Sequence, residues 1–379
     1  MDDIVASVQA HEAWLDERLA GATRRDDLDR KHLKMAGSAF DFLRATYWRW
    51  CEHAPGLADT PVVLSVGDIH VENFGTWRDV EGRLVFGVND FDEAAPMPWP
   101  QDPLRLLASA VMGAREKAPW APRQSFAALL LAGYRDGIAA PRPLILDGTG
   151  GLSDSLVATT EEDHRSFWEE EEDEAKQRAE DPPARFRTVL ERAFPPDAVI
   201  EDFYAREAGL GSLGRPRFAA LARFHGGRAL REAKALVPSA WTLRPDASAE
   251  ANHTAAAAAG AHRSPDAWFA VQDGIARRRL SPNNRKIEFP KKISGHMTPR
   301  PLHPDMLYAM GHDLAAIHAG TEGAAEAIAA ALAGKGGDPA WLEDAAMRLV
   351  QRVEQDHAAY VAANPDLAAK ASEKKKKKK

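Results

Sequence analysis

The stretch that decides the fold is Gly67-Asp68-Ile69-His70-Val71-Glu72-Asn73, and it is followed further along by Asn89-Asp90-Phe91-Asp92-Glu93. Two short apolar runs lie between these segments, at residues 73–77 and 83–88, and residues 79–82, with the sequence DVEG, separate them as a turn. Apolar runs of this length on either side of a turn are typical of a β-hairpin. Folding the hairpin between Glu81 and Gly82 sets Asn73 opposite Asp90.

The predicted hairpin brings oxygen-bearing side chains close enough to share a cation. Directly opposed residues lie about 4.5–5.5 Å apart at Cα, and Mg²⁺ binds oxygen atoms at about 2.0–2.1 Å. We therefore expect Asn73 and Asp90 to hold Mg²⁺, with Asp92 as an auxiliary ligand. Asp68 follows another apolar run, residues 61–66, and is left for base chemistry. A free carboxylate beside a metal site is the equipment of phosphoryl transfer.

The composition is that of an ordinary globular protein. The 379 residues are 45% apolar and 28% charged, which suits one large domain or two medium ones. No apolar run approaches about 18–20 residues, so we expect no membrane span and no membrane partner. The N-terminus lacks a basic region followed by an apolar core, so we expect a cytoplasmic protein. The single cysteine, Cys51, excludes an intrachain disulfide and a multi-cysteine metal site.

The net charge of −7 conceals an uneven distribution. Residues 374–379 are six lysines, and without them 43 basic residues face 56 acidic ones, a net charge of −13. A lysine run can bind nucleic acid or anionic lipid, but an acidic body argues against a nucleic-acid-binding surface. We expect residues 371–379 to be a disordered tail, and we expect no nucleic-acid partner.

The sequence pattern divides the chain into five segments. Residues 1–60 show helical spacing of apolar residues, and residues 61–195 hold the 67–93 unit followed by helices, as part of a helical lobe. From residue 196 to 295 strand-like runs at 199–208, 217–224 and 228–234 predict a three-stranded antiparallel meander in a β-rich lobe. Residues 296–370 return to helical spacing and complete the helical lobe, and residues 371–379 are the tail.

Residues 209–214, with the sequence GLGSLG, connect the first two strands of this meander and match the pattern G-x-G-x-x-G. A dinucleotide-binding site would need a helix after this pattern, whereas the residues after 216 are strand-like. A glycine-rich β-hairpin over nucleotide phosphates fits better. We expect the backbone at Gly209, Gly211, Ser212 and Gly214 to bind phosphates together with Lys234, which lies at the end of the third strand-like run.

Several of these motifs resemble parts of kinases. The spacing from Asp68 to Asn73 is that of the D-x-x-x-x-N catalytic loop of protein kinases, and Gly67 before Asp68 resembles the form found in aminoglycoside phosphotransferases. Residues 90–92 stand where kinases carry the metal-binding Asp-Phe-Gly, and residues 308–318 resemble the helix that precedes the catalytic loop. Over about residues 30–320 the chain is similar to the bacterial domain of unknown function 2252 family, which is related to the protein-kinase-like superfamily.

The resemblance implies an α+β, two-lobe, protein-kinase-like fold that uses ATP and Mg²⁺ to phosphorylate a hydroxyl group of a small-molecule acceptor. In ordinary kinases the glycine loop and the lysine precede the catalytic loop, whereas here the catalytic loop comes first by about 140 residues. The fold is therefore expected to be circularly permuted, with residues 1–60 as an extra helical segment. In kinase-like folds an aspartate at the position of Asp102 accepts hydrogen bonds from the catalytic loop, although Asp102 also suits a helix N-cap.

Other functions stay open at this stage. His70 either braces the loop or takes part in the chemistry, and we include it among the catalytic candidates beside Asp68. Transfer of AMP is compatible with the same site. A pseudokinase that binds nucleotide and acts as a regulator is an alternative, and Gly67-Asp68-Ile69-His70 also matches the first box of metallophosphoesterases. That last chemistry needs two metals about 3.5–4 Å apart, and the further boxes that would hold them do not follow in the sequence.

Overall fold

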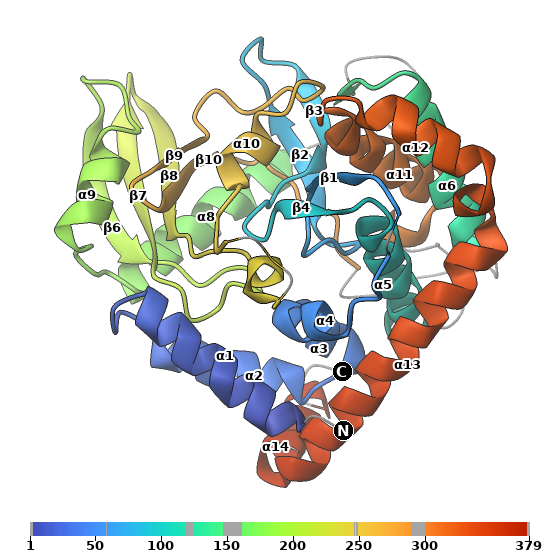
Figure 1. Cartoon of the computed structure of the whole chain (residues 1–379). Coiled ribbons are helices and arrows are strands. Elements are labelled where there is room, and N and C mark those ends of the chain that lie inside the picture. The colour runs from blue at the N-terminus through green and yellow to red at the C-terminus, as the bar shows by residue number, and fades with distance from the viewer. Residues whose placement is uncertain are drawn as a thin grey trace.

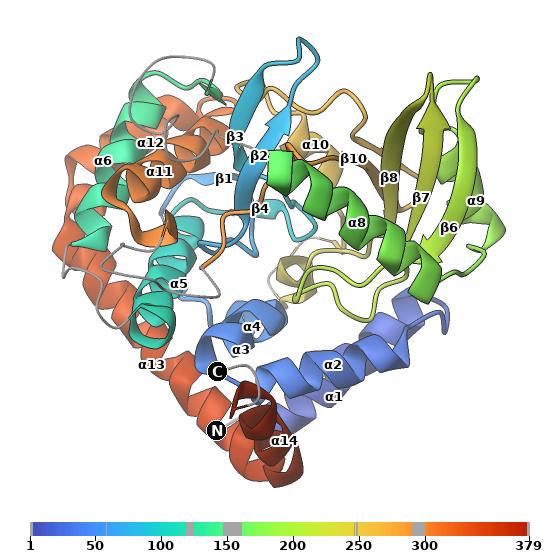
Figure 2. The same cartoon turned by 180° about the vertical axis from the view of Figure 1, so that it is seen from behind.

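The computed structural model describes residues 3–57, 59–118, 125–146, 161–245, 247, 249–289 and 300–376. Helices predominate at both ends of the chain, and an antiparallel sheet occupies the region between them (Figures 1 and 2). The mixed α+β class expected from the sequence is confirmed, while the kinase-like topology and the permutation stay predictions. Within the described ranges, no helix has the length and apolar character that crossing a bilayer requires.

The helical region surrounds the largest hydrophobic core. It consists of α5 (Gln101–Lys117), α6 (Phe126–Ala139), α11 (Pro304–Ala319), α12 (Ala324–Ala333) and α13 (Pro339–Ala363), with the short 3₁₀ helices η2 (Arg300–Leu302) and η3 (Lys335–Gly337). Met310, Leu314 and Ile317 in α11 are buried at helical spacing, as the sequence pattern predicts. Beside α11 the strands β1 (Val62–Ser65) and β4 (Ala95–Pro98) form an antiparallel pair.

The sheet region contains five antiparallel strands. In spatial order they are β6 (Val199–Ala205), β7 (Arg217–Phe224), β8 (Gly227–Ala235), β10 (Ile275–Leu280) and β9 (Ala270–Gln272). The first three form the meander expected from the sequence, and β10 and β9 extend it. The 3₁₀ helix η1 (Ala240–Leu243) and α10 (Thr254–Ala258) connect β8 to β9.

Helices α8 (Glu161–Gln177) and α9 (Ala184–Glu191) correct the segment boundary expected at residue 195, because they pack on the sheet and not in the helical region. Alternate residues of a strand face opposite sides of a sheet. Accordingly Phe218 on one face of β7 packs with Phe186 of α9, while Leu221 on the other face packs with Ala175 of α8. The apolar faces of these two helices match the two faces of the sheet (Figure 2).

The hairpin of β2 (Phe74–Arg78) and β3 (Leu84–Val88) is present, but its register differs from the prediction by one residue. Phe74 pairs with Val88, and the Asn89 N–H meets the Asn73 carbonyl at 3.3 Å, so Asn73 lies opposite Asn89 and not opposite Asp90. The reason is a three-residue loop closed by the pair Asp79–Arg83, with Gly82 in the left-handed region at φ +76°. β5 (Leu144–Ile145) continues this sheet beside β3.

Residues 285–289 form no regular strand. Instead a single bridge joins Lys286 to Gly75, and the flanking backbone bonds with β2 are Thr76 N–H to the Arg285 carbonyl at 2.8 Å and Ile287 N–H to the Phe74 carbonyl at 2.9 Å. This segment therefore lies along the edge of the hairpin.

The N-terminal segment links the helical and sheet regions. It comprises α1 (Ile4–Arg18), α2 (Arg25–Met35), α3 (Ala39–Ala45) and α4 (Tyr47–His53). Ile4 and Val8 of α1 lie in the large core, whereas Leu15 lies in the core beneath the sheet, so α1 spans both regions (Figure 1). Residues 371–376 of the expected disordered tail belong to the helix α14 (Pro365–Lys376), and Ala371 packs into the large core; residues 377–379 lie outside the described residues.

Candidate active site

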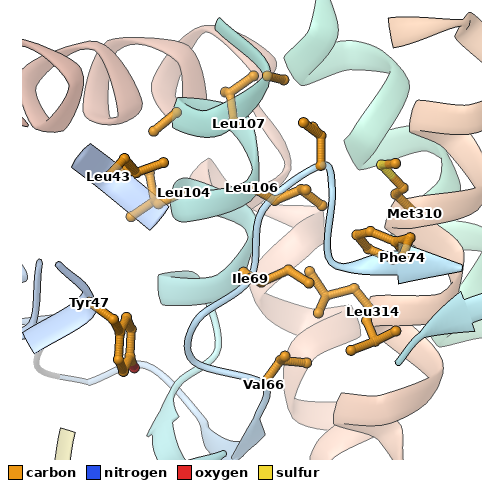
Figure 3. Close-up of a cluster of buried hydrophobic side chains, with 14 of the residues drawn as sticks. Leu43, Tyr47, Val66, Ile69, Phe74, Leu104, Leu106, Leu107, Met310 and Leu314 are labelled. Carbon is orange, nitrogen blue, oxygen red and sulfur yellow. The ribbon is translucent and has the colours of Figure 1, made fainter. Parts of the chain in front are cut away.

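The loop from residue 66 to 73 is anchored by alternation of its side chains. Ile69 and Val71 are fully buried, while Asp68, His70 and Glu72 line a cavity. Figure 3 shows the loop passing between α5 and α11, with Ile69 directed toward the side chains of α11. The buried side chains of Ile69 and Val71 thus fix the loop in the core, and the polar side chains beside them face the cavity.

Asp102 in α5 holds the start of this loop from behind. Its carboxylate accepts hydrogen bonds from the backbone N–H of Val66 at 2.7 Å and of Gly67 at 3.0 Å. The same carboxylate lies 3.0 Å from His318 Nε2, and the Tyr134 hydroxyl lies 2.6 Å from His318 Nδ1. Asp102 does not line the cavity. Four elements distant in sequence are thus joined by one buried polar chain behind the loop.

Asp68 is fixed by a residue that the sequence reasoning missed. Arg105 Nη2 of α5 donates to Asp68 Oδ1 at 2.5 Å and to the Leu43 carbonyl at 2.9 Å. The Arg105 guanidinium lies 5.0 Å from the Tyr47 ring and 5.1 Å from the Trp50 ring. Burial raises the pKa of Asp68 above its usual range, against the opposing charge of Arg105. An arginine inside the apolar run of residues 103–107 is the sequence signal that points to this contact.

His70 is held as a neutral ring. The Glu72 N–H donates to His70 Nδ1 at 3.2 Å, which leaves the ring proton on Nε2. Burial, together with the charges of Arg44 and Arg105, holds the pKa of His70 well below its usual range. His70 therefore braces the loop through Glu72, and its ring also borders the cavity.

Asn73 and Asp90 meet despite the change of register. Asn73 Nδ2 donates to the Asp68 carbonyl at 3.2 Å and to the Asp90 carbonyl at 3.1 Å. Because the amide nitrogen is used in this way, Asn73 Oδ1 is the atom available to a cation. Both side chains line the cavity. The Asn73 amide therefore joins the two motifs through their backbone, which the hairpin symmetry alone does not predict.

Lys234 of β8 reaches the second motif from the sheet. Its Nζ lies 3.1 Å from Asp90 Oδ2 and 2.6 Å from Asp92 Oδ2, and Arg215 pairs with Asp92 at 3.2 Å and with Glu93 at 2.5 Å. Burial raises the pKa of Asp90, but the charge of Lys234, the hydrogen bond with Asp92 and the charges of Arg278 and Arg217 together hold that pKa well below its usual range. Burial and the charge of Asp90 raise the pKa of Asp92 to about 6.

The partner of Lys234 is therefore a pair of aspartates. Kinases pair the corresponding lysine with a glutamate, but Glu250, which follows Lys234 in the sequence, pairs with Arg18 at 2.8 Å. Lys234 lies behind Asp90 and is not part of the wall of the large cavity.

The glycine loop covers Asp68. A methyl group placed on Gly211 would lie 2.8 Å from Asp68 Oδ2, and Gly209, Gly211 and Ser212 line the cavity. Gly214, in contrast, turns away from the cavity and packs on Leu28 of α2. The expectation that Gly214 contributes to a phosphate site is therefore corrected, because Gly214 contacts Leu28 of the N-terminal segment and does not line the cavity.

The cavity brings together most of the residues that the sequence singles out. Those that line it are Asp68, His70, Asn73, Asp90, Asp92, Gly209, Gly211 and Ser212. The structure adds cationic side chains that the sequence reasoning missed, namely Arg44, Arg215, Arg217, Arg278 and Lys286. Arg215 and Arg217 come shortly after the glycine loop in the sequence, and this basic pair is the sequence signal that points to them. Carboxylates and cations thus face each other across one cleft between the sheet, the hairpin and α3.

The oxygen atoms at the cavity suit Mg²⁺ that is bound together with a nucleotide. Among the residues that the structure describes, no group of three or more histidine, cysteine, aspartate or glutamate side chains is arranged to hold a metal. Mg²⁺ bound with a nucleotide needs only one or two protein carboxylates, because phosphates and waters supply the other oxygens. Asn73 Oδ1 and the Asp90 carboxylate meet that need. The Asp90 side chain is 31% exposed and that of Asp92 only 9%, which makes Asp90 the more accessible ligand.

Comparison with known proteins gives one match. Residues 25–194 match the model of a family described as an uncharacterized protein conserved in bacteria, DUF2252. No curated protein and no solved structure matches the chain. The matched segment contains the 67–73 loop, the 89–93 segment, Asp102 and Arg105, and it ends before the glycine loop. Over these residues, which are less than half of the chain, the sequence is similar to that bacterial family.

Proposed function

We propose that the protein is an ATP- and Mg²⁺-dependent phosphotransferase that acts on a hydroxyl group of a small molecule. The observation that carries the proposal is the meeting of Lys234 with Asp90 and Asp92, at 2.6–3.1 Å, beside the loop that holds Asp68 and beneath the glycine loop. A carboxylate for the acceptor, an oxygen pair for a metal and a lysine for phosphates are the parts that phosphoryl transfer requires.

Asp68 acts on the acceptor. Its carboxylate orients the acceptor hydroxyl and takes the hydroxyl proton as the new bond from oxygen to the γ-phosphorus forms and the bond from γ-phosphorus to the bridging oxygen of ADP breaks. Arg105 fixes the direction of the carboxylate through the 2.5 Å contact. The raised pKa of Asp68 makes it a better proton acceptor than an exposed aspartate would be.

The phosphates are bound from the opposite side. Asn73 Oδ1 and Asp90 would hold Mg²⁺, which would neutralise charge on the phosphate oxygens. Lys234 exchanges its contact with Asp90 for the phosphates, and the side chains of Arg217, Arg278 and Lys286 at the cavity add positive charge. Donors that are fixed before the substrate arrives stabilise a transferring group without reorganisation.

The test uses binding and turnover of Mg–ATP in the full chain. Asp68→Asn is expected to bind Mg–ATP as the wild type does and to lose turnover by about 100-fold or more, within the range of general-base catalysis. Asp90→Asn is expected to weaken the binding of Mg–ATP relative to metal-free ATP. The matched control is Asp197→Asn, whose carboxylate is exposed and pairs with His225 at the surface. If Asp68→Asn and Asp90→Asn both behave like this control, the assignment is wrong.

A nucleotide-binding regulator without turnover is a second candidate. It is supported by the way in which Lys234 is already engaged by two aspartates and Asp68 by Arg105. Binding of Mg–ATP without release of ADP or pyrophosphate would support the regulator, and release of pyrophosphate without ADP would support AMP transfer. Hydrolysis of a phosphodiester with Mn²⁺ alone would support a phosphoesterase, for which the described residues show no cluster of metal ligands.

A further inference from the structure

Lys31 of α2 is a buried amine that the proposed chemistry does not use. It is 3% exposed, its Nζ donates to the Gly211 carbonyl at 2.9 Å, and it lies 5.0 Å from the Trp48 ring. No carboxylate of the described residues forms a salt bridge with it. Burial lowers the pKa of Lys31 to about 8. Burial of a charged ammonium group that has one carbonyl as its hydrogen-bond partner lowers the stability of the fold, so the contact is expected to serve a function.

Two more contacts attach α2 to the same loop. The Arg24 N–H, at the start of α2, donates to the Gly214 carbonyl at 2.9 Å. The side chain of Leu28 lies directly against Gly214, because a methyl group there would come within 2.6 Å of Leu28 Cδ2. One face of α2 therefore follows the second half of the loop, and the loop is held from outside the sheet that carries it.

The contact from Lys31 fixes the orientation of one peptide group. In a trans peptide the carbonyl and the following N–H point in opposite directions, and the described residues contain no cis peptide. Since the Gly211 carbonyl points at Lys31, the Ser212 N–H points away from α2. In the part of the chain that the structure describes, no group accepts a hydrogen bond from this N–H. Gly211 and Ser212 both border the cavity that contains Asp68 and Asn73.

We propose that Lys31 is a positioning residue of the phosphate-binding loop: it holds the Gly211 carbonyl and thereby aims the Ser212 N–H at the phosphates of the bound nucleotide. Backbone N–H groups without a partner are rare in buried positions, and when they face a cavity they are suited to bind anions. This inference rests on the proposed function. It makes the N-terminal helix α2 part of the nucleotide site, although Lys31 itself does not touch the substrate.

The experiment compares Lys31→Met and Lys31→Arg with the wild type in the full chain. The probes are Mg–ATP and magnesium tripolyphosphate, measured by titration calorimetry, together with thermal melting. Lys31→Met is expected to bind both probes about 10-fold more weakly, which is the loss of about one hydrogen bond, and to melt no lower than the wild type. Lys31→Arg restores part of the affinity, because a guanidinium can also donate to the Gly211 carbonyl.

The control for the substitution itself is Lys117→Met. Lys117 also lies over an aromatic ring, with Nζ 5.9 Å from the Phe40 ring centroid, and it does not line the cavity. In turnover, Lys31→Met is expected to raise the KM for ATP and to leave kcat within about twofold, since only the phosphate contact changes.

Three results would overturn the inference. Wild-type affinity for both probes in Lys31→Met would show that the amine does not act on the phosphates. A lower melting temperature with unchanged affinity would show a structural role alone. If the wild type itself binds neither probe, the proposed function fails as well, so the two failures are distinguished by the wild-type titration.

Discussion

Replacement of Asp102 tests the buried polar chain that holds the catalytic loop. The carboxylate is 1% exposed and has three partners: the N–H groups of Val66 and Gly67 and the ring of His318. Asp102→Ala removes the acceptor from all three. A buried polar group without a partner costs about 1–3 kcal/mol, so the sum is about 3–9 kcal/mol. That is comparable with the whole stability of a typical domain, about 5–15 kcal/mol.

Asp102→Asn is the milder variant. Its single carboxamide oxygen can replace one carboxylate oxygen, while its NH₂ group faces one of the backbone donors, so we expect a loss of about 1–3 kcal/mol. The assay is urea denaturation, with hydrogen exchange at Val66 and Gly67 as a local measure. The control is Asp197→Ala, an exposed carboxylate that pairs with His225 and should cost less than about 1 kcal/mol. The reasoning is refuted if Asp102→Ala costs no more than this control.

Three further predictions concern the same neighbourhood. Gly67→Ala should destabilise the fold by more than the about 1–3 kcal/mol that a left-handed backbone costs a residue with a side chain, because its Cβ would lie 2.2 Å from the Glu93 carbonyl oxygen. The control is Gly226→Ala, which has φ +79° and no atom within 4 Å of the added Cβ, so that it measures the backbone cost alone. Equal losses of the two variants in urea denaturation would contradict the predicted clash. The pKa of Lys31 is lowered to about 8 in the folded state from an ordinary value of 10.5, so the unfolded chain binds more protons between these pH values. The stability contributed by this group therefore rises by up to about 3 kcal/mol as the pH increases through that range. The rise should be missing in Lys31→Met, and parallel pH profiles of the unfolding free energy would disprove it. Arg105→Met should leave the Kd of Mg–ATP unchanged and lower turnover by about 100-fold, since Asp68 loses its orientation. A melting curve checks that the variant is folded, and turnover equal to that of the wild type would exclude the positioning role of Arg105.

Part of the candidate site could be predicted from patterns of neighbouring residues in the sequence. The turn at residues 79–82 and the strand-like runs after residue 196 are patterns of neighbouring residues, and the structure has the corresponding hairpin and meander. The register was the exception. Asp79 accepts hydrogen bonds from the N–H groups of Glu81 and Arg83, which closes a three-residue loop, and composition does not separate that loop from a two- or four-residue one.

Contacts between segments that are distant in the sequence depend on tertiary packing and could not be predicted from local patterns. Arg105 and Asp102 stand three residues apart near the start of α5, yet one reaches the cavity side of the loop and the other its back. Which side each faces depends on how α5 lies against the loop and α11. In the same way α8 carries a run of glutamates that suggests a solvated surface, but Glu171 is buried and accepts a hydrogen bond from Tyr204 at 2.7 Å.

The sequence by itself determined the 67–93 unit, the strands around the glycine loop and the chemical types of the residues that gather at the site, because periodicity and turn chemistry are properties of adjacent residues. Only the tertiary structure decided that Lys234 meets Asp90, that Arg105 holds Asp68 and that Lys31 reaches Gly211. These contacts join segments whose relative placement is set by the packing of apolar faces across the whole chain. Many helices and strands carry such faces, and the choice among partners is made by the fit of their shapes in the core, which no short stretch of sequence records.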